Sequence, residues 1–97
     1  RLLVLDTGHK SFGVSAEIIS TITEKCFSKL KSKPERIANP DFPVPTSFAL
    51  AKNYYPNKYQ ICSKIFEMLS IKKKPPKKLI SLDKFQDQPF QGFKGPF

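Results

Sequence analysis

Apolar residues follow two distinct patterns in the first thirty positions. Leu2 to Leu5 are apolar without interruption, which is typical of a strand covered on both faces, as in a parallel sheet. Between this run and the next pattern, residues 7–11 read as a turn in which Gly8 supplies a backbone conformation that other residues resist. Apolar positions then recur three and four residues apart, and this spacing predicts one helix with the stripe Val14, Ile18, Ile19, Ile22, Cys26, Phe27 and Leu30.

The same order of strand and helix follows in the next forty residues. Residues 35–38 form a short strand candidate, and three prolines between 40 and 45 then make a rigid loop that fits neither a helix nor a central strand. Ser47 can cap one turn of helix, and Asn57 can cap a final helix with the apolar stripe Ile61, Cys62, Ile65, Phe66 and Leu69. Strand, helix, strand and helix in this order predict an α/β fold with crossover helices.

The composition changes sharply after residue 71. From 72 to 97 seven lysines stand against two aspartates, so about a quarter of the chain carries +5 of the formal net charge of +9. The run from 72 to 78 contains only lysine and proline, which is typical of a solvated, extended segment. We therefore predict one small domain over 1–71 and a basic, Pro/Phe-rich extension over 72–97.

An ordered set of short motifs resembles the C-terminal domain of the transketolase superfamily. Within that superfamily the set is most similar to the beta subunit of thiamine-diphosphate-dependent 2-oxo acid dehydrogenases of the pyruvate or branched-chain type. After the first strand, the matching motifs are Gly8-His9, Ala16-Glu17-Ile18, Arg36-Ile37, Pro40-Asp41-Phe42-Pro43-Val44-Pro45 and Tyr54-Tyr55-Pro56. Two departures suggest a divergent branch: Phe12-Gly13-Val14-Ser15 stands where the family has Gly-Gly-Phe-Gly, and Asp6-Thr7 stands where it has paired acidic residues.

The resemblance implies a three-layer αβα arrangement of which this chain is the later part. It also implies a parent enzyme that uses thiamine diphosphate and Mg and acts on a 2-oxo acid or transfers a two-carbon unit. Such enzymes assemble as a homodimer or an alpha/beta heterotetramer, and some dock on an acyltransferase core. The cofactor motifs of the family lie in other parts of these enzymes. This chain is therefore expected to bind no cofactor, to be inactive in isolation and to serve subunit assembly.

Few single residues suggest chemistry. His9 is the only histidine, and it follows the first strand at the end where open α/β sheets bind ligands. It is a candidate acid–base group, or it fixes the turn or touches a neighbouring subunit. No second group completes a catalytic set, so no catalytic, cofactor-binding or metal-binding residue is assigned. The contact candidates at a subunit interface are His9, Glu17, Arg36, Asp41, Tyr54 and Tyr55.

The contact candidates other than His9 also have local structural interpretations. Glu17 can be a first-turn carboxylate that the helix dipole favours. Asp41, next to a proline, can hydrogen-bond its own backbone, and Arg36 can hold that loop or reach a partner carboxylate. Tyr54 and Tyr55 can anchor the loop on the last helix instead of forming a contact surface.

Two strands and two main helices cannot cover both faces of a sheet. The chain also opens directly in an apolar strand, without an initiator methionine. We therefore expect a piece of a longer polypeptide, in which residues 1–71 need a preceding segment or a partner surface. Cys26 and Cys62 lack metal-ligand spacing, which favours a reducing, cytoplasmic setting. No apolar run reaches the roughly twenty residues of a membrane span, and binding of nucleic acid or another polyanion by the lysine run is the alternative function.

Overall fold

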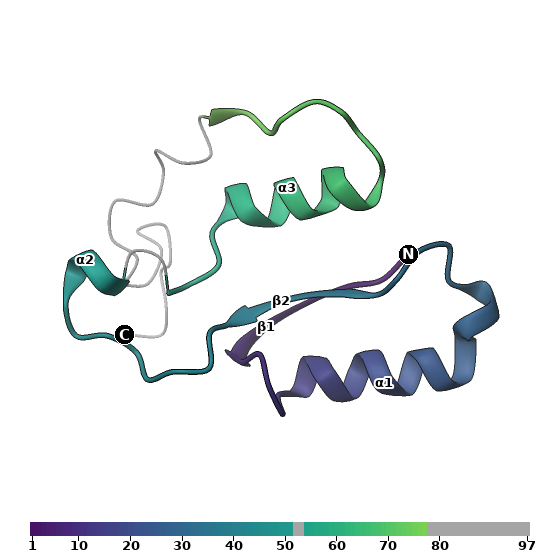
Figure 1. Cartoon of the computed structure of the whole chain (residues 1–97), viewed down its shortest axis with the longest axis horizontal. Coiled ribbons are helices and arrows are strands. Elements are labelled where there is room, and N and C mark those ends of the chain that lie inside the picture. The colour runs from purple at the N-terminus through teal and green to yellow at the C-terminus, as the bar shows by residue number, and fades with distance from the viewer. Residues whose placement is uncertain (52–53, 78–97) are drawn as a thin grey trace, which may run out of the picture.

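The computed structural model describes residues 1–51 and 54–77, and Figure 1 shows how they are arranged. Two parallel strands form the sheet, β1 at Leu3–His9 and β2 at Glu35–Asn39. They are joined by helix α1 at Val14–Cys26 and a 3-10 turn, η1, at Phe27–Lys29. The chain after β2 forms α2 at Phe48–Ala51 and α3 at Lys58–Met68. The predicted α/β class with a crossover helix is confirmed.

Helices α1 and α3 lie on opposite faces of the sheet (Figure 1). Successive side chains of a strand point to opposite faces, and the register places Leu5 beside Ile37. These two residues and Ile61 of α3 line a cavity of about 220 Å³, so this face of the sheet looks toward α3. Arg36 lines a separate cavity with residues of α1, so the other face looks toward α1. The three layers of the predicted αβα arrangement are therefore present.

The first strand is longer than its apolar run predicts. The pairing register shifts between Leu5 and His9, so that a bulge carries the strand on to His9. Within the bulge the backbone N–H of Gly8 donates to Oδ1 of Asp6 at 2.8 Å, which supplies a partner that the ladder does not. The prediction of a turn at residues 7–9 was wrong because a side chain replaces the missing backbone partner.

The chain turns one step later, at Phe12. This residue has a φ of 56°, in the left-handed region that few non-glycine residues adopt. No described glycine has a positive φ, so the conformational role assigned to Gly8 was wrong. Helix α1 begins at Val14 as predicted but ends at Cys26 rather than Leu30, because η1 tightens the last turn as short 3-10 segments commonly do at helix ends.

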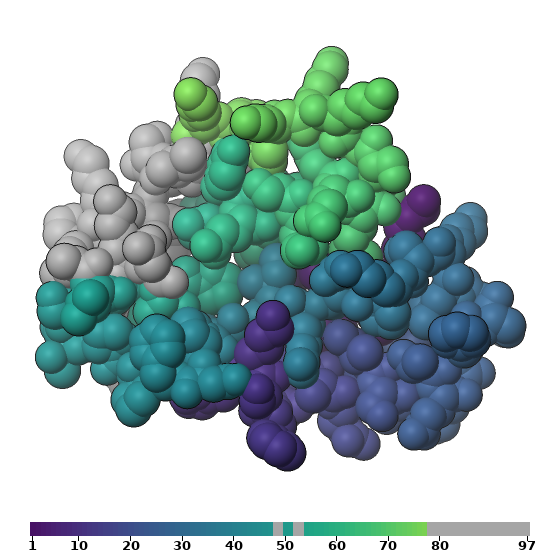
Figure 2. All heavy atoms as spheres, in the orientation of Figure 1, coloured from purple at the N-terminus to yellow at the C-terminus, as the bar shows by residue number. Residues whose placement is uncertain are grey.

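Apolar burial is sparse among the described residues. Ala51 and Tyr54 are buried, each 3% exposed, and Pro75 is buried as well. Leu5, in the middle of β1, keeps 53% of its surface exposed. In the space-filling view, α3 and the segment after it form one side of the molecule, and α1 with η1 forms the other (Figure 2). Large apolar side chains exposed on the helices are Val14 and Ile18 of α1, Leu50 of α2 and Ile65 of α3.

The described lysines of the basic extension are exposed, whereas Pro75 between them is buried, so the prediction of a fully solvated segment was wrong at this residue. Lys72, Lys73 and Lys74 are exposed, and residues 72–76 form neither helix nor strand. The remainder of the predicted extension, 78–97, lies outside the described residues, and the division of the chain at residue 71 stays a prediction. No described helix has the length and apolar character needed to cross a bilayer.

Helix α3 begins with the cap that its sequence predicts. The side chain of Asn57 accepts from the backbone N–H of Gln60 at 2.8 Å, and the side chain of Gln60 accepts from the backbone N–H of Asn57 at 3.1 Å. This reciprocal capping box satisfies two donors that a helix start leaves open. The short helix α2 differs, because the N–H groups of Leu50 and Ala51 both donate to the backbone carbonyl oxygen of Ser47.

Removal of the α3 cap is expected to destabilise the fold. Asn57→Ala should lower the free energy of unfolding by about 1 kcal/mol, because one orphan helix donor loses its acceptor. Asn57→Asp keeps an acceptor at the helix N-terminus, where a negative charge is favoured, and should preserve stability. Urea denaturation followed by circular dichroism measures both variants. Equal stability of the two variants would contradict a capping role for this side chain.

Candidate functional site

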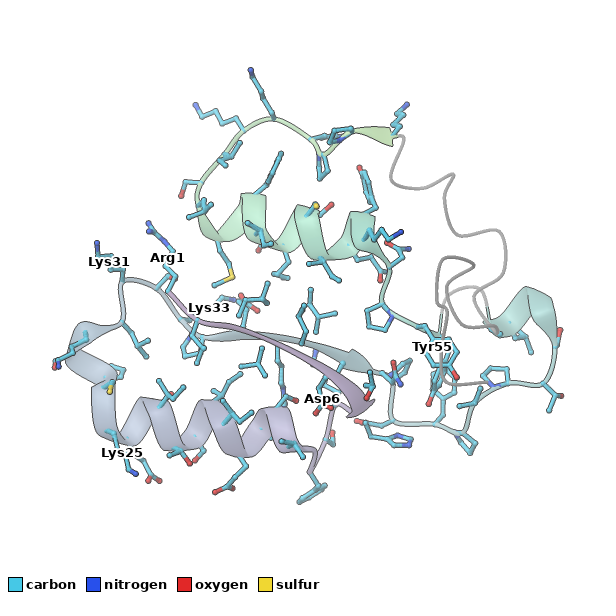
Figure 3. The ribbon with its side chains drawn as sticks, turned by 180° about the vertical axis from the view of Figure 1, so that it is seen from behind. Arg1, Asp6, Lys25, Lys31, Lys33 and Tyr55 are labelled. Carbon is cyan, nitrogen blue, oxygen red and sulfur yellow. The ribbon has the colours of Figure 1, made fainter. Side chains whose placement is uncertain are left out.

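Side-chain hydrogen bonds fix the chain at the carboxyl ends of the two strands, beginning with those of Asp6. The N-cap of α1 is Gly13, which has no side chain to cap the helix. Asp6 takes over this role, since its Oδ2 accepts from the backbone N–H of Ser15 at 3.0 Å. Its Oδ1 holds the bulge at Gly8. One carboxylate therefore joins the end of β1 to the start of α1, and Figure 3 shows Asp6 at that corner.

A second carboxylate joins the two loops that leave the strands. The backbone N–H of Ser11 donates to Oδ1 of Asp41 at 2.8 Å, and the Ser11 hydroxyl donates to Oδ2. Asn39, which is buried, donates from Nδ2 to the carbonyl oxygen of Thr7 at 2.6 Å. Asp41 thus bonds a loop thirty residues away instead of its own backbone, so its local interpretation was wrong. The proline loop is tied directly to the loop after β1.

Tyr54 anchors the proline loop from the other side. Its hydroxyl donates to the carbonyl oxygen of Phe42 at 3.0 Å. Its ring stands edge-on to Phe42, with centroids 5.4 Å apart, and edge-on to Tyr55 at 5.0 Å. Such edge-to-face pairs are favourable beyond their burial. Tyr54 is therefore the buried centre of an aromatic group, and Tyr55 is half-buried beside it.

Three predicted contact residues meet at this edge of the sheet. His9 and Arg36 both act electrostatically on the Asp41 carboxylate, and His9 is exposed. Glu17 lies apart from this group, exposed in the first turn of α1, where the helix dipole favours it. Sequence reasoning missed Ser11 and the structural role of Asp6. The available signal for Asp6 was an acidic residue at a strand end, followed by a helix whose own cap position is glycine.

Serine, histidine and aspartate at one place do not make a hydrolytic site here. A nucleophilic serine must donate its proton to a histidine base, which the acidic residue orients. The hydroxyl of Ser11 instead donates to Asp41. The arrangement therefore positions two loops, and His9 stays an acid–base candidate.

The described residues do not form a metal site. Among residues 1–51 and 54–77, no group of three or more His, Cys, Asp or Glu side chains lies close enough to hold a cation. Cys26 and Cys62 are free thiols and half-buried. These residues do not fit a centre for Mg with a diphosphate, and the expectation that this chain binds no cofactor stays a prediction.

A known protein family matches the region that contains the carboxyl ends of both strands. The family described as "Transketolase, C-terminal domain" matches residues 1–61. This chain belongs to that family. The matched range includes both strands, α1, the carboxylates of Asp6 and Asp41 and the start of α3.

Curated relatives of this transketolase C-terminal domain carry the name pyruvate dehydrogenase E1 component subunit beta. The Mycoplasma genitalium protein is 49% identical over 45 residues, and the Mycoplasma pneumoniae protein is 47% identical over 45 residues. Each alignment covers 46% of this chain and 14% of the relative. The mitochondrial protein of Chaetomium thermophilum is 32% identical over 71 residues, covering 73% of this chain and 19% of the relative.

The chain thus spans between a seventh and a fifth of the length of these relatives. No solved structure gives a significant match. The resemblance read from the sequence motifs is confirmed at the level of the family, and the relatives' names agree with the beta-subunit type.

The carboxylates of Asp6 and Asp41 predict how the stability of this transketolase C-terminal domain responds to acid. The pKa of Asp6 lies below its usual value, chiefly because the N–H groups of Gly8 and Ser15 stabilise the charged form. The pKa of Asp41 is also lowered, first by the Ser11 hydroxyl and then by the Ser11 N–H. A lowered folded-state pKa stabilises the fold above the unfolded-state pKa, and this contribution disappears as the pH falls through the folded-state value.

We therefore expect the stability of the native chain to fall steeply below about pH 4. Asp6→Asn and Asp41→Asn should each be less stable at neutral pH and should lose less on acidification. Urea midpoints measured at several pH values between about 2 and 7 give these slopes. Glu24→Gln, at an exposed position of α1, is the matched control and should keep the native slope. Identical slopes for all four proteins would show that neither Asp6 nor Asp41 contributes.

Proposed function

We propose that this transketolase C-terminal domain is the subunit-assembly portion of a thiamine-diphosphate-dependent 2-oxo acid dehydrogenase of the pyruvate dehydrogenase E1 beta type. The observation that carries the proposal is the exposure of Leu5. This residue lies in the middle of a parallel strand, on the face toward α3, and 53% of its surface is uncovered. Parallel strands are usually covered on both faces, so an uncovered apolar side chain in such a place favours a covering surface from another part of the protein or from a partner subunit.

In this proposal the chain contributes architecture and contacts, and the catalytic groups belong to the rest of the parent enzyme. The rest of the parent enzyme also binds thiamine diphosphate and Mg. The enzyme works in a reducing, cytoplasmic compartment. The covering surface comes from the remainder of the same subunit or from other subunits in a homodimer or alpha/beta heterotetramer. A docking surface for the acyltransferase core is a finer part of the same proposal. The 49% and 47% identity to two E1 beta subunits supports this type of parent.

A chimera tests the proposal. The homologous segment of the Mycoplasma genitalium beta subunit is replaced by the matching residues of this chain, and the chimera is produced with its alpha subunit. We expect the chimera to form the same oligomer as the native subunit. It should also decarboxylate pyruvate at a rate within about tenfold of the native rate, because the catalytic groups are unchanged and the replaced segment alters the activation barrier little. Size-exclusion chromatography with light scattering measures the oligomer. A folded chimera that neither assembles nor turns over pyruvate would overturn the proposal.

A polar substitution at Leu5 separates assembly from folding. Leu5→Gln should be tolerated by the isolated chain, with a change of about 1 kcal/mol or less, because the side chain is largely exposed there. The same substitution should impair assembly of the chimera, where this residue becomes covered. Val44→Gln, in the proline loop and 50% exposed, is the matched control. Normal assembly of the Leu5→Gln chimera would contradict a covered Leu5.

Polyanion binding is a second candidate function, favoured by one specific observation. Arg1, Lys31 and Lys33 lie together at the end of the sheet where the strands begin (Figure 3). Helix α3 ends on the same side of the molecule, and the segment after it, with exposed Lys72, Lys73 and Lys74, begins there and runs back over α3 in Figures 1 and 3. Clustered cations bind phosphates through counterion release. Retention on heparin should then fall with salt, and simultaneous Lys→Gln substitution at 72–74 should weaken it, whereas Lys25→Gln should not.

A further inference from the structure

The outer edge of β2 is an unpaired strand edge beside a cationic slot. In the described residues β2 pairs only with β1. The N–H of Glu35 donates to Leu2, and the carbonyl oxygen of Asn39 accepts from Lys10, so these positions of β2 point their backbone groups toward β1. Backbone direction alternates along a strand, and Arg36 and Ala38 therefore direct their N–H and carbonyl groups toward the open edge. Such an edge is a template for another extended segment.

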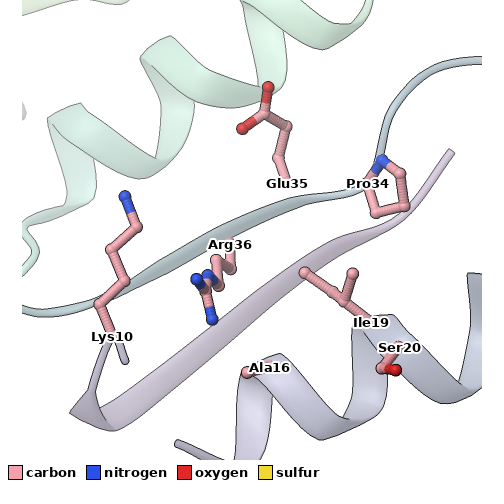
Figure 4. Close-up of a pocket in the computed structure, with 7 residues that line it drawn as sticks. All are labelled: Lys10, Ala16, Ile19, Ser20, Pro34, Glu35 and Arg36. Carbon is pink, nitrogen blue, oxygen red and sulfur yellow. The ribbon is translucent and has the colours of Figure 1, made fainter. Parts of the chain in front are cut away.

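A cavity of about 380 Å³ lies between this strand and α1 (Figure 4). Its apolar wall is made by Ala16 and Ile19 of α1 and by Pro34. The two cationic lining residues are Lys10 and Arg36. A cavity with an apolar wall and a few polar groups that converge on it is typical of a site that holds one side chain or one small group.

The two cations of this slot are not held in ion pairs by their described neighbours. Glu35 also lines the cavity, but Figure 4 shows it directed toward α3. There its carboxylate pairs with Lys33 at 3.1 Å and with Lys64 at 3.9 Å. Asp41 acts on Arg36 electrostatically, while both of its oxygens accept from Ser11. Among the described residues neither Lys10 nor Arg36 forms an ion pair, so both are available to an anion.

We propose that the open edge of β2 binds a short extended peptide segment whose acidic side chain enters the slot between β2 and α1. The backbone of the segment pairs with Arg36 and Ala38, as in other cases of strand addition to a sheet edge. Its carboxylate accepts from the guanidinium of Arg36 and the ammonium group of Lys10, and its methylene groups lie against Ile19. Charge complementarity selects the acidic residue, and the backbone pairing distinguishes an extended segment from a free anion.

This inference does not depend on the assembly role proposed above, because it concerns peptide binding by the 97-residue chain itself. The probe is a fluorescein-labelled peptide, acetyl-Thr-Val-Glu-Val-Thr-amide, titrated with the chain and followed by fluorescence anisotropy. We expect saturable binding that weakens with added salt. Replacing the central Glu of the peptide by Gln should weaken binding about tenfold, since a hydrogen bond between charged groups is lost.

Protein variants then test the two cations of the slot. Arg36→Gln should weaken binding about tenfold, and Arg36→Lys should weaken it less, because a lysine keeps the charge but loses the two-pronged geometry. Lys10→Gln, at an exposed residue, should weaken binding about threefold without affecting the fold. Lys25→Gln, on the last turn of α1 and outside the slot, is the matched control and should bind normally.

Two further probes test the strand edge. Methylation of alternate peptide nitrogens removes the donors needed for pairing and should abolish binding, even though the charge is unchanged. Inorganic phosphate and free glutamate should compete only weakly. Equal binding of the methylated peptide, or equal binding of the Gln peptide, would overturn the proposal. Unchanged binding by Lys10→Gln and Arg36→Lys together would do the same, and these two variants decide the question if Arg36→Gln fails to fold.

Discussion

Gly13→Ala should lower the free energy of unfolding by about 2–3 kcal/mol, the range expected when an atom is forced into a packed site. A Cβ at this position would lie 2.3 Å from the carbonyl oxygen of His9 and 3.3 Å from Oδ2 of Asp6. The first contact is with backbone, so no side-chain rotation relieves it. The end of β1 and the start of α1 must separate, and the hydrogen bond from Ser15 to Asp6 is expected to weaken with them.

Gly8→Ala is the matched control for this prediction. Its new Cβ would lie 3.3 Å from Oδ1 of Asp6, a side-chain atom that can move slightly, and Gly8 has no positive φ. The loss should therefore stay below about 1 kcal/mol. Urea denaturation at neutral pH measures both variants. Equal losses would contradict the difference in available space between the two positions, and a Gly13→Ala variant as stable as the native chain would refute the close approach.

Features that depend on local sequence patterns could be predicted, whereas the end of β1 beside Gly13 could not. The apolar run of β1, the helical spacing of α1 and the cap at Asn57 are local patterns, and each led to an element of the correct type in the correct order. The end of β1 could not be predicted in this way. It depends on where the Asp6 carboxylate reaches, and that position is set only when α1 has packed against the sheet.

Several residues at the carboxyl ends of the strands were predicted from the sequence, but their arrangement was not. His9, Arg36 and Asp41 were each named as contact residues, because strand ends and proline loops are common places for function. The hydrogen bond that joins the two loops runs from Ser11 to Asp41, thirty positions along the chain. Neither residue stands in a pattern with the other along the chain. Long-range pairs of this kind follow from the crossover that brings both carboxyl ends to one edge.

The aromatic anchor of the proline loop leads to the largest loss that we expect from one side chain. Tyr54→Ala should lower the free energy of unfolding by about 3–5 kcal/mol, the range for removal of a buried aromatic ring. Tyr54 is 3% exposed, and its ring contacts both Phe42 and Tyr55. A loss of this size is comparable with the whole stability of a small domain, so the variant should have no cooperative unfolding transition.

Tyr54→Phe separates the ring from its hydroxyl. The ring contacts stay, and only the hydrogen bond to the Phe42 carbonyl oxygen is lost, so the variant should lose about 1 kcal/mol and unfold cooperatively. Phe42→Ala removes a ring that is 50% exposed, and its loss in the free energy of unfolding should lie between those of Tyr54→Phe and Tyr54→Ala. Hydrogen exchange of the amides in residues 41–47 should rise in the order native, Tyr54→Phe, Phe42→Ala, because each step loosens the loop before it unfolds the chain. If Tyr54→Ala unfolded as cooperatively as Tyr54→Phe, the proline loop would have to be held by its prolines alone.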